Sequence, residues 1–435
     1  MYSFRLCRQA GLLRSFFRLA LIAVILSPVC FPVAALELAS AGTIRSQECD
    51  LISYSFPYKN GLYSTLAGFL NIPDLELKNQ KTFKLEIEGF KNKLQVKAIL
   101  QSNLAPLVVI IPGLDGKADG RLGKLWPSWY ANAGYHVVWF DSTFLPSFVE
   151  PSGHGVTGNL SAESERVRDI IKTFINLNEV KGRISKLGIV GMSYGGIEAL
   201  MLGQMAAEGR LPFAVDAIQA YSPPIDLRKT GELIDRWYLE DRWEYTLAEL
   251  AGKLSCHKPV CSDYQVPFTD SFMRAGIAAA FRLGLADLVD RNDRVYKLGL
   301  LPGGNNFDDA YVRMDYAALW GYSKFMNELS YPYWQKKLKL NDLTELTAKI
   351  QLPGLLEKQP AYSETILAED DPFNTPEDME NLKTLASSLP LTVLPRGGHL
   401  GFINESWTRA KLLTIFKSAT TLPASPSHIE VRNQE

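Results

Sequence analysis

The run Gly191-Met192-Ser193-Tyr194-Gly195-Gly196 constrains the fold of this chain more than any other stretch. It follows the short apolar segment 187–190 and precedes the helix-forming segment 197–202. A strand that passes into a helix through one serine needs a turn so sharp that neighbouring side chains would collide, which explains the glycines. We expect the serine to have a strained backbone conformation, with its hydroxyl above the edge of a sheet. The pattern predicts a mostly parallel sheet flanked by helices.

A serine hydroxyl is a poor nucleophile unless a histidine accepts its proton and a carboxylate orients that histidine. After a turn of this kind, the acid and then the histidine follow the serine along the chain. Three histidines follow Ser193, and two of them, His257 and His428, lie in an insertion and in a polar tail. His399 lies instead in a glycine-rich loop between the strand-like segment 391–394 and a terminal helix. His399 is therefore the predicted base.

The predicted acid follows the strand-like segment 363–368. Asp370 and Asp371 come just after this segment, and Pro372 follows them. A residue before proline is held in an extended conformation, which suits an acid that projects from a strand toward the histidine loop. Asp371 is therefore the predicted acid and Asp370 the alternative. A purely structural role for both, as caps of the next segment, stays open.

The negative charge that develops during acyl transfer needs two backbone N–H donors. One is expected to be the amide of Tyr194, which directly follows the serine. The other is expected in the turn Gly113-Leu114-Asp115-Gly116, which ends the apolar strand 107–111. The amide of Leu114 is the predicted donor in that turn.

These motifs together resemble the YheT-type α/β-hydrolases, a group of esterases and phospholipase-like enzymes. The resemblance covers about 83–416 and is carried by the turn at 113–116, the serine motif, Asp370-Asp371-Pro372-Phe373 and Gly397-Gly398-His399-Leu400-Gly401-Phe402. Phe307-Asp308-Asp309 with Trp320-Gly321-Tyr322-Ser323 is similar to a lid signature of that group. The resemblance implies a triad of Ser193, Asp371 and His399 and the hydrolysis of carboxylic esters. The chain departs from the group at Pro112, where a histidine is usual, and in its long middle insertion.

The N-terminus predicts export. Four arginines precede the apolar run 19–26, which Pro28 interrupts and small residues follow, as in a secretory signal peptide. The small residues after the apolar run allow cleavage after either Ala35 or Ala41, and the sequence does not decide between them. The run is short for a membrane span, and an uncleaved membrane anchor is the alternative. We thus expect a leader at 1–41 of a secreted or periplasmic protein, and membrane-surface contact through the lid or an uncleaved leader stays open.

The remaining composition limits partners and cofactors. Cys256 and Cys261 are spaced for a small disulfide loop in an oxidising compartment, although the sequence does not decide whether it forms. With His257 between them they fit no common zinc pattern, so no metal or cofactor is expected. The formal net charge is -1, which provides no electrostatic footprint for nucleic acid.

The order of segments predicts an α/β-hydrolase domain at 42–420 with a helical lid at 226–349, followed by a disordered tail at 421–435. The expected strands are an antiparallel opening pair at 84–88 and 93–100, then 106–111, 135–140, 187–190, 214–220, 363–368 and 391–394, and the expected helices include 161–176, 272–285 and 311–329. The predicted function is hydrolysis of small-molecule or lipid esters by a serine esterase or lipase. A serine peptidase or amidase of the same fold is one alternative. A non-catalytic binding protein is the other, although it predicts the loss of a triad member.

Overall fold

The structure is a computed structural model that describes residues 54–153, 155–240, 269–303, 307–341, 346, 351–385 and 389–416. The expected leader at 1–41, the Cys256–Cys261 loop and the tail at 421–435 lie outside the described residues. Among the described helices, none has both the length and the hydrophobicity needed to cross a bilayer.

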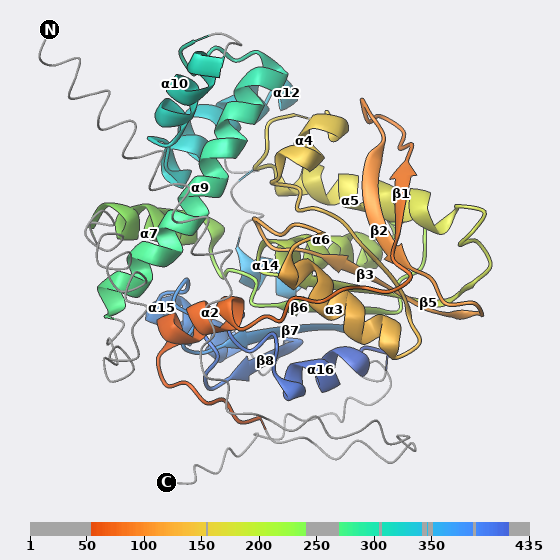
Figure 1. The fold of residues 1–435 in the computed structure, drawn as a ribbon. Helices are drawn as coiled ribbons and strands as arrows, with labels where there is room; N and C mark the ends of the chain where they lie inside the picture. The colour runs from red at the N-terminus through yellow and green to blue at the C-terminus, as the bar shows by residue number, and fades with distance from the viewer. Residues whose placement is uncertain are drawn as a thin grey trace, which may run out of the picture.

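An eight-stranded sheet forms the centre of the molecule, in the order β1-β2-β4-β3-β5-β6-β7-β8 (Figure 1). β1 pairs antiparallel with β2, and β2 with β4, whereas the other neighbours are parallel. The expected opening pair and the mostly parallel sheet are therefore confirmed, with strand ends shifted by a few residues. The strands are β1 (Lys81–Leu85), β2 (Leu94–Ile99), β3 (Ala105–Ile111), β4 (His136–Trp139), β5 (Ile184–Met192), β6 (Ala217–Tyr221), β7 (Ser363–Ala368) and β8 (Leu391–Leu394).

Helices cover both faces of the sheet because alternate side chains of its buried strands point to opposite sides. Val109 and Ile111 pack with α5 (Leu160–Ile175) and α6 (Tyr194–Ala207). Val108 and Ile110 pack on the other face, where Trp126 is fully buried. The helices of that face are α3 (Arg121–Asn132) and α16 (Ser406–Leu413). The remaining helices outside the insertion are α2 (Gly61–Leu70), α4 (Pro146–Ser152), α14 (Leu352–Leu356) and α15 (Pro376–Leu385).

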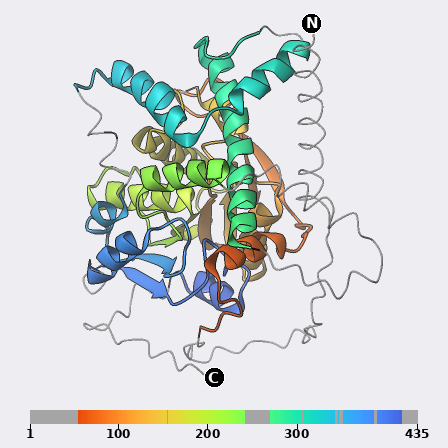
Figure 2. The same cartoon turned by 90° about the vertical axis from the view of Figure 1, so that its left-hand side faces the viewer.

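The described part of 226–349 is helical. It follows β6 and precedes β7 in the chain, and it lies beside the edge of the sheet (Figures 1 and 2). We call its members the insertion helices: α7 (Leu227–Glu240), α9 (Asp270–Tyr296), α10 (Phe307–Ala317), α11 (Tyr322–Lys324), the π-helix η2 (Phe325–Ser330) and α12 (Tyr331–Leu338). The expectation of one helical run over 311–329 is wrong, because Gly321 is extended at the start of α11. The carboxylate of Asp235 there accepts hydrogen bonds from the amides of Tyr322 (2.9 Å) and Ser323 (2.8 Å), so a new helix begins.

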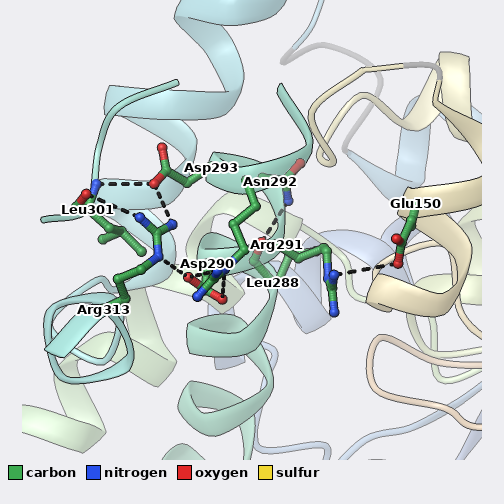
Figure 3. A network of polar contacts seen from close by, with 9 residues as sticks. Glu150, Leu288, Asp290, Arg291, Asn292, Asp293, Leu301 and Arg313 are labelled. Atoms are coloured by element: carbon green, nitrogen blue, oxygen red, sulfur yellow. Dashed lines mark hydrogen bonds and ion pairs between the residues drawn. The ribbon is translucent and has the colours of Figure 1, made fainter. Parts of the chain in front are cut away.

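Charged pairs fasten the outer insertion helices to one another and to the rest of the fold (Figure 3). Arg313 on α10 is 6% exposed, and its guanidinium donates to Asp290 (2.8 Å) and Asp293 (2.6 Å) of α9. Arg291 of α9 reaches Glu150 of α4 at 3.5 Å. Since removing one partner leaves the other charge buried and unpaired, the Arg313 contacts fix α10 on α9.

Candidate active site

The strand order and the turn at Ser193 are those of the α/β-hydrolase fold, which holds its nucleophile at a strand-to-helix turn above the sheet. Ser193 follows β5, Asp371 comes shortly after β7, and His399 lies in the loop after β8. These three strands are parallel to one another through β6, so their carboxyl ends meet at one edge of the sheet. The sheet thereby brings together three residues that are far apart in the chain.

The turn at Ser193 has the geometry that its glycines predict. Ser193 has φ 53° and ψ −121°, a conformation that L-residues rarely adopt. Its amide donates to the carbonyl of Tyr221 at 2.8 Å. A Cβ atom on Gly191 would lie 2.0 Å from the oxygen of Gly195, and one on Gly195 would lie 2.2 Å from the oxygen of Pro112. The predicted need for glycine on both sides of the serine is confirmed.

A line of hydrogen bonds joins the three predicted residues. Ser193 Oγ lies 2.8 Å from His399 Nε2, and His399 Nδ1 lies 2.8 Å from Asp371 Oδ2. The other carboxylate oxygen, Oδ1, accepts the amide of Phe373 at 2.9 Å, which fixes the orientation of the carboxyl group. Ser193, Asp371 and His399 are 8%, 3% and 1% exposed. With the Nδ1 proton directed at Asp371, Nε2 presents a lone pair to the serine hydroxyl.

Asp370, the alternative acid, points elsewhere. Its Oδ1 accepts the amide of Gly398 at 2.8 Å, and its buried Oδ2 has no hydrogen-bond partner among the described residues. Burial, followed by the charge of Asp371, raises the pKa of this carboxyl, while the Gly398 bond opposes the rise. Asp370 therefore braces the backbone of the histidine loop, and Asp371 is the carboxylate in contact with the imidazole.

Helix α2 supports the histidine loop, which sequence reasoning missed. The amide of His399 donates to Thr65 Oγ1 at 2.9 Å. A Cβ on Gly68 would lie 2.5 Å from the Cα of Gly401, so the helix and the loop are in backbone contact. The one available signal was a stripe of small residues at helical spacing, Gly61, Ser64, Thr65 and Gly68. Such a stripe permits close approach but does not identify what approaches.

A mostly apolar pocket opens beside the serine, with about 760 Å³ of empty space including its mouth. Its walls come from the sheet domain and from the insertion helices, and Arg228 and Glu232 are its charged lining residues within the described chain. The apolar and aromatic lining residues are Leu114, Phe144, Tyr194, Pro224, Leu227, Ile234, Phe281, Tyr322, Met326, Tyr331 and Phe373. The pocket has the apolar and aromatic walls, with a small number of polar groups, that are typical of small-molecule sites.

The two predicted amide donors belong to residues that lie beside Ser193. Tyr194 is the first residue of α6, where backbone N–H groups have no acceptor within the helix. Leu114 lines the same pocket, in a turn closed by a 2.9 Å bond from the amide of Gly116 to the carbonyl of Gly113. A Cβ on Gly113 would lie 3.2 Å from the Cβ of Ser193, which shows how close this turn is. The role of the two amides stays a prediction.

Neither a family model nor a curated protein matches the chain. Among solved structures, an esterase of Pyrococcus furiosus shares 13% identity over 78% of this chain and 92% of its own, with a TM-score of 0.41. A membrane phospholipase A described as a bacterial virulence factor shares 13% over 78% and 87%, with a TM-score of 0.42. A proline iminopeptidase of Mycobacterium smegmatis shares 14% over 78% and 98%, with a TM-score of 0.39. Likenesses at this level do not identify an activity, so the resemblance to the YheT-type group stays a prediction.

Proposed function

We propose that this protein is a serine hydrolase that cleaves carboxylic esters through an acyl-enzyme intermediate. The observation that carries this proposal is the buried line of two 2.8 Å contacts from Ser193 Oγ through the imidazole of His399 to Asp371. Each atom in this line has the role that nucleophilic catalysis by serine requires.

The first half of the reaction forms the acyl-enzyme. Ser193 Oγ attacks the ester carbonyl carbon while its proton passes to His399 Nε2. Asp371 stabilises the imidazolium that results, and the amides of Tyr194 and Leu114 stabilise the oxyanion. When the intermediate collapses, His399 returns the proton to the leaving alcohol. In the second half, water attacks the acyl group by the same steps and frees Ser193.

The walls of the pocket support an ester with an apolar acyl group. Aromatic and aliphatic side chains from both the sheet domain and the insertion helices line it next to Ser193. Burial of a hydrocarbon chain there would contribute roughly 0.8 kcal/mol per CH₂ group. In this proposal the insertion helices are a lid that supplies one wall of the acyl site, and the substrate is a small-molecule or lipid ester.

Export of the chain is part of the proposal and is supported by the leader-like composition of 1–41. Fractionation of cells that express the full chain tests it. Mass spectrometry of the exported protein should find an N-terminus just after Ala35 or Ala41. Recovery of the uncleaved chain in the membrane fraction would favour the anchor instead.

The central experiment replaces the nucleophile. Ser193→Ala should abolish hydrolysis of p-nitrophenyl esters and labelling by a fluorophosphonate, while the fold remains intact. Ser128→Ala is the matched control, because it also removes a hydroxyl that donates to a carbonyl (2.6 Å), but on α3 and away from the site. Unchanged turnover in Ser193→Ala would refute the proposal. Faster cleavage of peptide amides than of esters would instead favour the peptidase, and binding without turnover would favour a non-catalytic protein.

A further inference from the structure

Two buried glutamates lie near Tyr194, the residue that follows Ser193. Glu163 belongs to α5 and Glu198 to α6, and both are 0% exposed. The reaction described above uses neither of them. A buried carboxylate is costly unless hydrogen bonds compensate its lost hydration, so the partners of these two groups indicate what they do.

The two glutamates differ in their partners. Glu163 Oε1 accepts the amide of Gly158 at 2.6 Å, and its Oε2 accepts the hydroxyl of Tyr194. Glu198 Oε1 accepts the hydroxyl of Thr143 at 2.9 Å, whereas its Oε2 is buried with no partner among the described residues. Two donors stabilise a negative charge better than one. The charge of the pair therefore belongs on Glu163.

The pKa values of the pair follow from these contacts. Burial, followed by the charge of Glu163, raises the pKa of Glu198 far above its usual range, which favours its neutral form. Burial also raises the pKa of Glu163, to about 7, and the bonds from Tyr194 and Gly158 oppose the rise. Glu163 therefore changes charge near neutral pH. Among titratable groups, Glu198 and Tyr194 adjoin it, and Tyr331 of α12 lies near Tyr194.

The bond from Tyr194 fixes the side chain of a residue whose amide is a predicted oxyanion donor. The ring of Tyr194 is 1% exposed and packs edge-on against Phe144, with 4.9 Å between ring centroids. Glu163 holds the hydroxyl at the far end of this ring. With both the ring and its hydroxyl held, the backbone at the start of α6 has little freedom to move.

The other oxygen of Glu163 holds a loop that the insertion helices surround. Main-chain groups of the loop 155–158 bond to side chains of α9, η2 and α12. One of these side chains, Asn292 of α9, is labelled in Figure 3, which does not label the loop itself. The bonds join the Gly155 amide to Tyr296 Oη (3.1 Å), the Thr157 amide to Asn292 Oδ1 (3.4 Å), Ser330 Oγ to the Thr157 carbonyl (2.7 Å) and Trp334 Nε1 to the Val156 carbonyl (2.6 Å).

The glycines of this loop allow an unusually close approach. Gly155 and Gly158 have φ of 146° and 106°. A Cβ on Gly155 would lie 2.8 Å from the ring of Trp334, and one on Gly158 would lie 2.5 Å from Ser330 Oγ. Because the loop packs directly against η2 and α12, without space for even a methyl group, a displacement of these helices displaces the loop.

From these contacts we infer that Glu163 is a positioning residue, which holds the Tyr194 amide toward the oxyanion and links the turn at Ser193 to η2 and α12 through the loop 155–158. This inference rests on the proposed function, because it assigns a role within that reaction. The ionised carboxylate accepts both of its hydrogen bonds at once. A protonated carboxyl can keep its contact with Tyr194 only by donating to the hydroxyl, and the bond then loses its charge assistance. The positioning is therefore strongest above neutral pH and weakens as the pH falls.

Glu163→Gln tests the inference, because it keeps the shape and removes the charge. We measure kcat and KM for a short-chain p-nitrophenyl ester between pH 5.5 and pH 9. The ratio of wild-type to variant kcat should be about tenfold at pH 9, as expected for a donor misplaced by a fraction of an ångström, and should approach one at low pH. KM should change less than twofold.

Two further variants test the connections of Glu163. Tyr194→Phe removes the hydroxyl that donates to Glu163 but keeps the backbone amide of residue 194. The ratio of wild-type to Tyr194→Phe kcat should therefore depend on pH in the same way as the ratio for Glu163→Gln. Ser330→Ala removes the donor to Thr157 and should lower kcat about threefold in the wild type, but no further in Glu163→Gln, because the two residues act in series. Ser128→Ala on α3 should leave kcat unchanged. Thermal unfolding establishes that each variant is folded.

The outcomes separate the inference from the function on which it rests. A wild-type protein without Ser193-dependent hydrolysis would overturn both. With hydrolysis established, equal kcat in Glu163→Gln and wild type would overturn the inference alone. A tenfold ratio that stays constant with pH would also overturn it, since it would indicate only a loss of structure. Should Glu163→Gln fail to fold, Tyr194→Phe decides by the same ratio.

Discussion

Replacing Asp371 by asparagine should inactivate the protein by moving the imidazole proton of His399 from Nδ1 to Nε2. The amide of Phe373 donates to Asp371 Oδ1 at 2.9 Å, so this position needs an acceptor. In Asp371→Asn the side-chain oxygen therefore stays at Oδ1, and the NH₂ group takes the place of Oδ2, 2.8 Å from His399 Nδ1. His399 must then accept at Nδ1 and carry its proton on Nε2, where it cannot take a proton from Ser193.

The size of the loss follows from the same geometry. The variant must reach the transition state with the wrong tautomer or break a buried hydrogen bond, and in well-studied triads the wrong tautomer lowers kcat by about 10⁴. This corresponds to about 5.5 kcal/mol of transition-state stabilisation. Asp370→Asn should cost no more than about tenfold, because its oxygen can still accept the Gly398 amide and no contact with the imidazole is lost.

The assay compares kcat and KM of the two variants with the wild type on one short-chain p-nitrophenyl ester, with circular dichroism as the control for folding. We expect kcat to fall in Asp371→Asn with little change in KM, because the carboxylate does not line the pocket. A larger loss in Asp370→Asn would refute the reasoning and reassign the acid. Equal, modest losses would show that the orientation of the imidazole does not limit the reaction.

Two further predictions concern the turn and the pocket. Gly195→Ala should lower the free energy of unfolding, measured with urea, by more than about 1 kcal/mol, because its Cβ would lie 2.2 Å from the oxygen of Pro112. Gly276→Ala lies inside α9 and its Cβ would meet nothing within 4 Å, so it should raise the free energy of unfolding by up to about 1 kcal/mol. Unfolding midpoints that rank the other way would contradict this steric account. Met326→Trp should lower kcat/KM for an octanoate ester roughly tenfold and leave a butyrate ester nearly unchanged, because Met326 lines the apolar pocket. Met326→Leu is the volume-matched control, and equal losses on both esters would mean that η2 does not form the acyl wall.

The sequence predicts those parts of the structure that short-range rules determine. Gly191 and Gly195 identify the turn because a side chain at either position collides with backbone only a few residues away or on the adjacent strand. Asp371 could be preferred over Asp370 because the following proline restricts its backbone. The strands of the sheet are recognisable because burial on both faces demands continuous apolar segments.

Contacts between distant segments could not be predicted in this way. The periodicity of 311–329 is helical throughout, and the interruption at Gly321 depends on Asp235, which lies 87 residues from Tyr322 in the chain. Glu163 resembles any acidic residue in the first turn of a helix, where the helix dipole favours it. Its bond to Tyr194 becomes visible only once α5 and α6 are packed side by side.

The packing of α2 on the histidine loop has a consequence for how the active protein comes into existence. Thr65 and His399 are 334 residues apart, and their hydrogen bond joins nearly the two ends of the described chain. Contacts between such distant residues form late in folding, because the entropy of closing so long a loop must be overcome first. During synthesis, a chain that has already formed the strands beside Ser193 still lacks the imidazole of His399 and its contact with α2 until residue 399 has been added. The proposed nucleophile and base are therefore brought together only after more than 200 further residues have followed Ser193.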